Sequence, residues 1–164
     1  MPYTQQYDSP VGSILLIADS TELTGLYFNS EKYFARYPAA MHEKKETPLL
    51  HTVKRWLDIY FSGKEPGFTI PLHLSGTNFQ NDVWSMLCTI PYGTTVSYGT
   101  IAKQIAAKRG LSRMSAQAVG GAVGRNKIPI IIPCHRVIGA NGSLIGYSGG
   151  LDKKVKLLTL EGLL

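Results

Sequence analysis

Residues 130–137 constrain this chain more than any other stretch, and they read Ile-Ile-Ile-Pro-Cys-His-Arg-Val. Prolines at 129 and 133 bracket the three isoleucines. Proline inside a helix removes a hydrogen bond and clashes with the preceding turn, so the run cannot lie in the middle of an amphipathic helix. We predict a buried extended segment that ends at Cys134.

Cys134 is a candidate nucleophile. A thiol needs a depressed pKa to react at neutral pH, and His135, Arg136 or a nearby helix N-terminus would supply that depression. The alternative is an inert core cysteine, since free cysteines are among the most buried residues. The polar pair that follows favours the reactive interpretation, because burying it without a purpose is costly. Adjacent side chains of an extended chain point apart, so we expect a bridging water between Cys134 and His135.

The residues around Cys134 resemble a known active site. Pro133-Cys134-His135-Arg136-Val137 follows Asn126 and precedes Gly146-Tyr147-Ser148-Gly149-Gly150-Leu151. This pattern resembles the active-site region of the O6-alkylguanine-DNA alkyltransferases, also called methylated-DNA-protein-cysteine methyltransferases. The resemblance is dense from Phe79 to Gly162. It implies a DNA repair protein that flips O6-alkylguanine out of duplex DNA and transfers the alkyl group irreversibly to its own Cys134, once per molecule and without a cofactor.

The charge distribution agrees with a nucleic-acid partner. Residues 1–75 carry 7 Lys+Arg and 8 Asp+Glu, whereas residues 76–164 carry 10 and 3. A polyanion would dock on the basic half, although such a surplus can also serve solubility alone. The 4 His and 2 Cys lack paired metal-ligand spacing, so we expect no metal site. The start of the chain has no secretion signal and no apolar stretch reaches bilayer length, so we expect a soluble, cytoplasmic protein without membrane contact. We also expect the protein to be a monomer.

The predicted fold class is α+β. A small N-terminal antiparallel sheet with a helix, in residues 1–75, would be a supporting domain, and a mainly helical domain in residues 76–164 would bind DNA and transfer the alkyl group. The N-terminal strands are predicted at residues 3–7, 13–18, 23–29 and 68–74. Between them, residues 30–46 read as a loop or frayed helix, and Thr47 caps a helix that Pro48 begins and Gly63 ends.

The C-terminal half contains a predicted helix-turn-helix. Thr77 and Gln80 form a capping box before a helix that stops at Pro91. A helix over 98–106, a basic loop over 108–113 and a second helix over 115–124 follow. The second helix is rich in Gly and Ala, which suits either close approach to a nucleic-acid groove or tight packing between helices.

The rest of this half is predicted to form a hairpin and a last helix. The hairpin spans residues 137–145, with its turn at 139–142. The last helix runs from about Leu151 to Glu161. Its side chains divide into an inward set, Leu151, Val155 and Leu158, and an outward set, Lys153, Lys154 and Lys156.

The family resemblance also assigns roles to catalytic and substrate-binding residues. His135 would take the Cys134 proton through a water, Glu161 would orient the imidazole, and Tyr98 would donate to guanine N3. The substrate pocket would use the Ser148 amide toward O6, the carbonyls of Cys134 and Val137 toward the exocyclic amine, and Tyr147 as a wall. Asn126 would tie the second helix to the active-site turn.

The resemblance implies that the second helix enters the minor groove of double-stranded DNA, where few base edges can be read. The DNA-binding residues would be Ser115, Gln117, Ala118, Gly121, Arg125 and Arg136. One position departs from the family. The family usually has Arg at position 117, where it fills the gap left by the flipped base, and Gln117 lacks its charge and planar reach.

The sequence can be compared with three other functions. A non-catalytic alkylguanine lesion-binding protein is the main alternative, but such relatives typically have Trp in place of Cys134. A cysteine hydrolase would need a second His base near an Asn or Asp. A helix-turn-helix regulator would need long polar side chains on its second helix.

Overall fold

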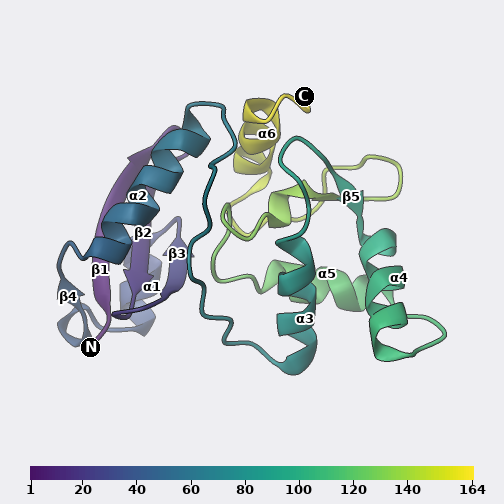
Figure 1. The fold of residues 1–164 in the computed structure, drawn as a ribbon, viewed down its shortest axis with the longest axis horizontal. Helices are drawn as coiled ribbons and strands as arrows, with labels where there is room; N and C mark the ends of the chain where they lie inside the picture. Colours follow the sequence, from purple (N-terminus) through teal and green to yellow (C-terminus); the bar gives the residue numbers. More distant parts are fainter. The chain divides into compact units, whose positions relative to one another are not determined.

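The computed structural model describes all 164 residues and divides them into two compact units, Met1–Leu74 and Ser75–Leu164 (Figure 1). The first unit contains a sheet with flanking helices and the second is mainly helical, which confirms the predicted α+β class. No helix has both the length and the apolar content needed to cross a bilayer.

The N-terminal unit is built on a four-stranded sheet in the order β3-β2-β1-β4. The first three strands are antiparallel neighbours, as predicted, whereas the two-residue β4 pairs with β1 in parallel. The strand bounds are β1 Tyr3–Ser9, β2 Gly12–Ala18, β3 Leu23–Tyr27 and β4 Glu43–Lys44. Residues 14–18 of β2 are all buried, so this central strand forms the core of the unit.

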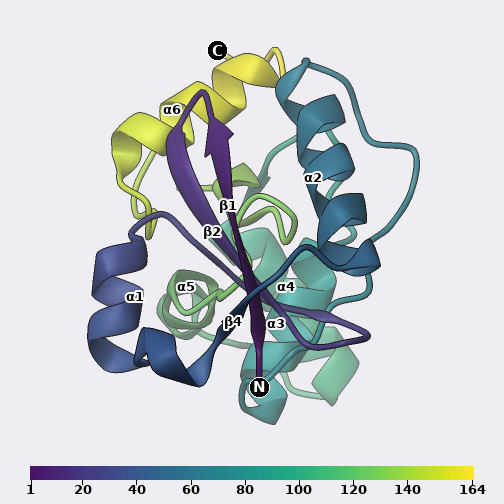
Figure 2. The same ribbon diagram turned by 90° about the vertical axis from the view of Figure 1, so that its left-hand side faces the viewer.

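Two helices flank this sheet. Helix α2, Pro48–Phe61, begins where the sequence predicted, because the Thr47 hydroxyl accepts the Leu50 amide at 3.1 Å. Helix α1, Ser30–Arg36, is capped by Asn29 and precedes a short 3-10 turn, η1, at Ala39–Met41. Figure 2 shows the strands lying between α1 and α2. The buried residues of α2 are Leu50, Val53, Leu57 and Tyr60.

The strand predicted over residues 68–74 is wrong. The segment makes one isolated parallel bridge, between Leu72 and Leu23. The Leu23 amide donates to the Pro71 carbonyl at 2.9 Å, and the His73 amide donates to the Leu23 carbonyl at 3.0 Å. Pro71 has no amide hydrogen, so the pairing cannot continue as a ladder toward the start of the segment.

The C-terminal unit begins with three packed helices. They are α3 Asn78–Leu87, α4 Tyr98–Arg109 and α5 Ala116–Gly124. The predicted capping box is present: the Thr77 hydroxyl accepts the Gln80 amide at 3.1 Å, and the Gln80 side chain accepts the Thr77 amide at 3.0 Å. Helix α4 is three residues longer than predicted and ends at Gly110, whose φ of 66° suits glycine.

Helices α4 and α5 form the predicted helix-turn-helix, and α3 supports both. The Trp84 indole donates to the Ala122 carbonyl at 2.9 Å, which joins α3 to α5. The Asp82 carboxylate bonds Lys108 at 3.0 Å and Arg109 at 2.8 Å, which joins α3 to the end of α4.

Ile130 and Ile132 are buried and Ile131 is half-buried, but the run is not extended, contrary to the prediction. The Ile132 amide donates to the Ile128 carbonyl at 2.9 Å, so the chain turns back on itself. Ile130 lies at a φ of 73°, which is strained for a β-branched residue. The short 3-10 turn η2, Cys134–Arg136, follows directly.

The predicted hairpin after this turn is also wrong. Strand β6, Val137–Ile138, pairs in parallel with β5, Val96–Ser97, rather than with residues 143–145. A turn does form at the predicted place, because the Gly139 amide donates to the Ser143 carbonyl at 2.8 Å. The residues after it continue without ladder bonds.

The last helix, α6 Leu151–Leu160, is rotated relative to the prediction. Leu151 and Val155 are 47% and 40% exposed, whereas Lys154, predicted to point outward, is fully buried. Leu158 points inward as expected, together with Leu157. The burial of this lysine is explained by the three carbonyl groups that accept hydrogen bonds from its amine.

We predict that Thr77→Ala lowers the free energy of unfolding of the C-terminal unit by about 1 kcal/mol, because it removes the hydroxyl that caps α3. Urea unfolding followed by Trp84 fluorescence in a Trp56→Phe background measures this unit separately. Thr159→Ala is the matched control, since this exposed hydroxyl bonds only to its own helix. Equal effects of the two variants would contradict the assigned role of the cap.

Candidate active site

Cys134 begins the η2 turn and is only 4% exposed. Burial raises the pKa of its thiol to about 11. A hydrogen bond from the Asn126 side chain, the charge of Lys154 and the nearby backbone amides oppose this rise without overcoming it. The expectation of a depressed thiol pKa is therefore wrong for the free protein, in which the sulfur carries its proton at neutral pH.

His135 and Glu161 form a buried pair. The imidazole Nε2 lies 2.6 Å from Glu161 Oε2, and both side chains are fully buried. Burial lowers the pKa of His135, and Glu161 opposes that change. The structure thus brings together two predicted catalytic residues that are 26 positions apart in the chain. Glu161 occupies the C-cap position of α6 and faces the core rather than solvent.

Arg136 does not face outward, which corrects its predicted assignment to DNA binding. Its Nε donates to Glu161 Oε1 at 2.8 Å and its Nη1 donates to the Ile90 carbonyl at 2.8 Å. Its guanidinium also lies over the Tyr92 ring, 5.7 Å from the centroid. The side chain is only 9% exposed, and its positive charge is paired with the buried Glu161 carboxylate.

Lys154 belongs to the site, although the sequence analysis predicted that this lysine would point outward. Its ammonium donates to the carbonyls of Val137 at 2.7 Å, Ile145 at 3.1 Å and Gly146 at 3.2 Å. Burial lowers the pKa of Lys154 itself. The lysine therefore joins α6 to β6 and to the loop after β6. Its positive charge also opposes the rise in the pKa of the Cys134 thiol.

Asn126 lies between the second helix of the helix-turn-helix and Cys134 in the chain. Its amide nitrogen donates to the Ile132 carbonyl at 2.9 Å, and its oxygen accepts the Ile128 amide at 2.9 Å. These two bonds fix the turn that precedes Cys134 from its inner side. The Val137 carbonyl, assigned to the substrate amine, accepts a bond from Lys154 in this structure.

The remaining predicted substrate residues are less tightly held. The Tyr98 hydroxyl donates to the Ile145 carbonyl at 3.2 Å, and burial raises the pKa of this phenol. Cys134 contributes a smaller rise to the same group, so the two side chains are near enough to interact. Tyr147 is half-buried and Ser148 is exposed.

The outer face of α5 is nearly free of side-chain bulk. The Ser115 hydroxyl accepts the Ala118 amide at 3.2 Å and caps the helix. The exposed positions of the helix and its C-cap are Ala116, Gln117, Ala118, Gly121, Gly124 and Arg125. The buried positions are Val119, Ala122 and Val123. The glycines at 121 and 124 face open space, so helix packing does not account for them.

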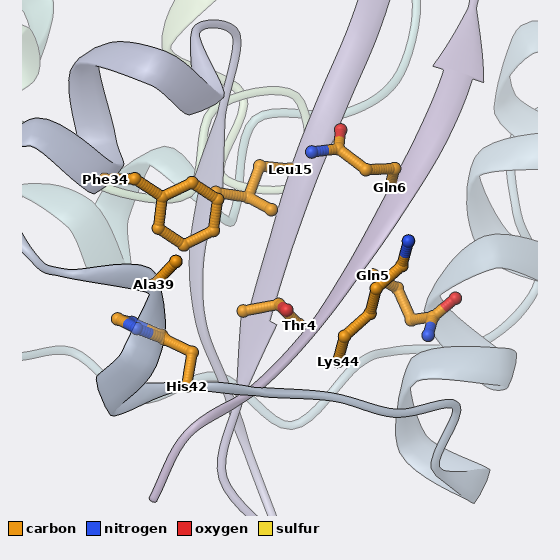
Figure 3. Close-up of a pocket in the computed structure, with 8 residues that line it drawn as sticks. All are labelled: Thr4, Gln5, Gln6, Leu15, Phe34, Ala39, His42 and Lys44. Atoms are coloured by element: carbon orange, nitrogen blue, oxygen red, sulfur yellow. The ribbon is translucent and has the colours of Figure 1, made fainter.

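The N-terminal unit contains a separate hollow of about 250 Å³ between β1 and the segment from α1 to β4 (Figure 3). Leu15 and Phe34 line its apolar part, and His42 and Lys44 lie at its polar edge. His42 is already bonded to the Tyr33 hydroxyl at 2.9 Å and to the Pro38 carbonyl at 3.0 Å. The hollow has no cysteine, and no cluster of three potential metal ligands occurs in the protein.

Comparison with known proteins gives consistent matches to both units. Residues 3–74 match the family model described as 6-O-methylguanine DNA methyltransferase, ribonuclease-like domain. Residues 78–163 match the model described as 6-O-methylguanine DNA methyltransferase, DNA binding domain. The methylated-DNA–protein-cysteine methyltransferase of Mycobacterium leprae is 45% identical over 161 residues, which cover 98% of this chain and 93% of that protein. That of Methanosarcina acetivorans is 44% identical over 160 residues, covering 98% of each.

Solved structures resemble the fold over nearly its whole length. The crystal structure of Mycobacterium tuberculosis OGT in complex with DNA has a TM-score of 0.82 at 41% identity and covers 97% of this chain and 92% of that one. The O6-methylguanine-DNA methyltransferase of Pyrococcus kodakaraensis has a TM-score of 0.69 at 25% identity, covering 99% of each chain.

We predict that iodoacetamide alkylates Cys134 about two orders of magnitude more slowly than free cysteine at pH 7.5, because only the thiolate reacts and the thiol pKa is raised to about 11. The Cys88→Ser variant leaves Cys134 as the one thiol, and intact mass follows the reaction. The rate should increase about tenfold per pH unit from pH 7 to 9.5, with urea-unfolded protein as the accessible control. A rate that levels off below pH 9 would contradict the raised pKa.

Proposed function

This chain belongs to the 6-O-methylguanine DNA methyltransferase family, and from that premise we propose that it repairs DNA by moving the alkyl group of O6-alkylguanine onto its own Cys134. The observation that carries the proposal is a buried cysteine followed in sequence by a histidine that is paired with a buried carboxylate. A nucleophile, a base and an orienting acid are the groups that such a transfer requires.

The transfer is a displacement at the alkyl carbon. The Cys134 sulfur forms a bond to that carbon while the bond between the carbon and guanine O6 breaks, and the electron pair of the broken bond moves into the guanine. The thiol proton leaves the sulfur and one proton is added to the guanine ring, so the products are a thioether and unmodified guanine. A thioether does not revert under cellular reductants, so each molecule acts once. No cofactor enters this balance.

His135 is the proposed base for the thiol proton. Its Nε2 is engaged by Glu161 at 2.6 Å, so the proton would arrive at Nδ1 through a bridging water. A thiol with a pKa of about 11 gives up its proton only as the transfer proceeds, and the carboxylate stabilises the imidazolium that then forms. The charge of Lys154 favours the thiolate during the same step.

Tyr98 and the loop over residues 146–150 are the proposed substrate pocket. Donation from the Tyr98 hydroxyl to guanine N3 would stabilise negative charge as the leaving group departs. In the free protein this hydroxyl donates to the Ile145 carbonyl, so that bond must exchange for the one to N3. The Ser148 amide toward O6, the carbonyls of Cys134 and Val137 toward the amine, and the Tyr147 ring complete the pocket.

DNA is the proposed partner, since the Mycobacterium tuberculosis relative has been solved in complex with DNA. A buried sulfur cannot reach a stacked base, so the alkylated guanine must leave the duplex at a cost of a few kcal/mol. The exposed Gly and Ala positions of α5 let the backbone approach a minor groove closely. Gln117 would occupy the gap left by the base, and Ser115, Ala118, Gly121 and Arg125 would contact the strands around it. We propose that the protein acts as a monomer.

We predict that incubation with duplex DNA containing one O6-methylguanine adds the mass of one CH₂ to Cys134 and stops at one equivalent. Intact mass and peptide mapping check both points, and Cys134→Ala abolishes the gain. The matched control is Cys88→Ser, which alters the exposed cysteine and should transfer normally. Tight, lesion-selective binding without a mass gain would instead indicate a non-catalytic alkylguanine-binding protein.

We predict that Gln117→Arg raises the second-order rate of this transfer roughly threefold or more, because a guanidinium adds charge and planar reach in the space left by the flipped base. Single-turnover kinetics with limiting lesion DNA measure the rate. Gln117→Lys restores charge without the planar group and should fall between the two. The labelling of Cys134 by iodoacetamide should not change, and an unchanged repair rate would show that position 117 does not limit base extrusion.

A further inference from the structure

Three donors from two segments, the η2 turn and the turn after α3, surround the Glu161 carboxylate. Its Oε2 faces His135 Nε2 at 2.6 Å. Its Oε1 accepts Arg136 Nε at 2.8 Å and the Gly93 amide at 3.0 Å. Because Glu161 is fully buried, the carboxylate cannot spread its charge into water and depends on these partners.

We propose that Arg136 is a positioning residue for the alkyl transfer: by balancing the charge of Glu161, it keeps His135 neutral and able to accept the Cys134 proton. This inference rests on the proposed function, in which His135 is the base. It also gives the inward-facing Arg136 a role that contact with DNA would not explain.

The argument begins with charge. A buried carboxylate 2.6 Å from an imidazole strongly favours the protonated ring, since attraction between charges grows as the surroundings become less polar. An imidazole that is already protonated cannot accept a proton from the thiol. Arg136 supplies a positive charge to the same carboxylate, so the imidazole faces a pair with little net charge rather than an uncompensated anion.

The other groups around His135 do not compensate the negative charge of Glu161 as directly as Arg136 does. Burial disfavours the imidazolium, and the charges of Arg136 and Lys154 act in the same direction against Glu161. Lys154 donates hydrogen bonds to three backbone carbonyls, whereas Arg136 donates directly to the Glu161 carboxylate. The Cys134 thiol is protonated and adds no charge in the resting state.

Geometry adds a second contribution. Arg136 is held at two further points, by the Ile90 carbonyl at 2.8 Å and by the Tyr92 ring. Since the guanidinium and the Gly93 amide both engage Oε1, the carboxylate cannot rotate freely and Oε2 stays directed at the imidazole. Positioning and charge balance therefore come from one side chain.

The direct test is an NMR titration of the His135 imidazole in free protein labelled at histidine, with His135→Asn used for assignment. In Arg136→Gln the imidazole should titrate about one pH unit higher than in the wild type, because the carboxylate loses its compensating charge. Arg136→Lys keeps the charge and should stay close to the wild type. The signals of His42, His51 and His73 are internal controls and should not move.

A double variant separates the effect of the lost charge from a folding defect. Arg136→Gln leaves a buried carboxylate without its cation, whereas Arg136→Gln combined with Glu161→Gln removes both charges. In the double variant His135 should titrate below its position in Arg136→Gln, and thermal unfolding should recover part of any loss. Unchanged titration in Arg136→Gln, with the fold retained by circular dichroism, overturns the proposal. Equal upward movement in Arg136→Lys and Arg136→Gln also overturns the charge argument.

The kinetic test follows the transfer rate with pH. The acid side of the profile, where His135 becomes protonated, should move about one pH unit toward alkaline pH in Arg136→Gln, so that the loss of rate is large at pH 6 and small at pH 8.5. A structural defect alone would lower the rate equally at every pH, and that result would count against the proposal. If the wild type transfers no alkyl group, the proposed function fails, while the NMR titration still decides whether Arg136 controls His135.

Discussion

The arrangement of the site in the C-terminal unit depends on one buried carboxylate, that of Glu161. Taking a negative charge out of water costs several kcal/mol unless cations and hydrogen bonds surround it. Here the partners come from the η2 turn and from the turn that follows α3. The last helix must therefore dock before the site exists, and residues from distant parts of the chain become parts of one charged cluster. The surroundings of Cys134 therefore depend on the end of α6 as much as on the residues next to it in sequence.

The regions that could be predicted from the sequence are those whose structure depends on residues close together in the chain. The capping box at Thr77 and the Thr47-Pro48 start of α2 depend on residues three positions apart, and both helices begin where that chemistry requires. The family motif likewise led to Cys134, His135 and Glu161 as candidates, and the last two lie in contact.

The features that could not be predicted depend on partners far away in the chain. Lys154 reads as an exposed residue because nothing near it in sequence indicates the three carbonyls that receive its ammonium. Arg136 reads as a DNA contact for the same reason, since its carboxylate partner is 25 residues away. The isoleucine run was predicted to be extended from composition and prolines alone, and the Asn126 bonds that hold it as a turn lie outside those rules.

Helix α5 shows what a smooth outer face costs the protein. Its nine residues include three glycines, and helices this short are marginal in water even with better sequences. Its order comes from outside, through three buried residues and the Trp84 indole bond to the Ala122 carbonyl. Residues 116–124 thus have no independent tendency to remain helical. Local opening of this segment is expected to precede global unfolding, so the amide hydrogens of α5 would exchange sooner than those of α3 beneath it.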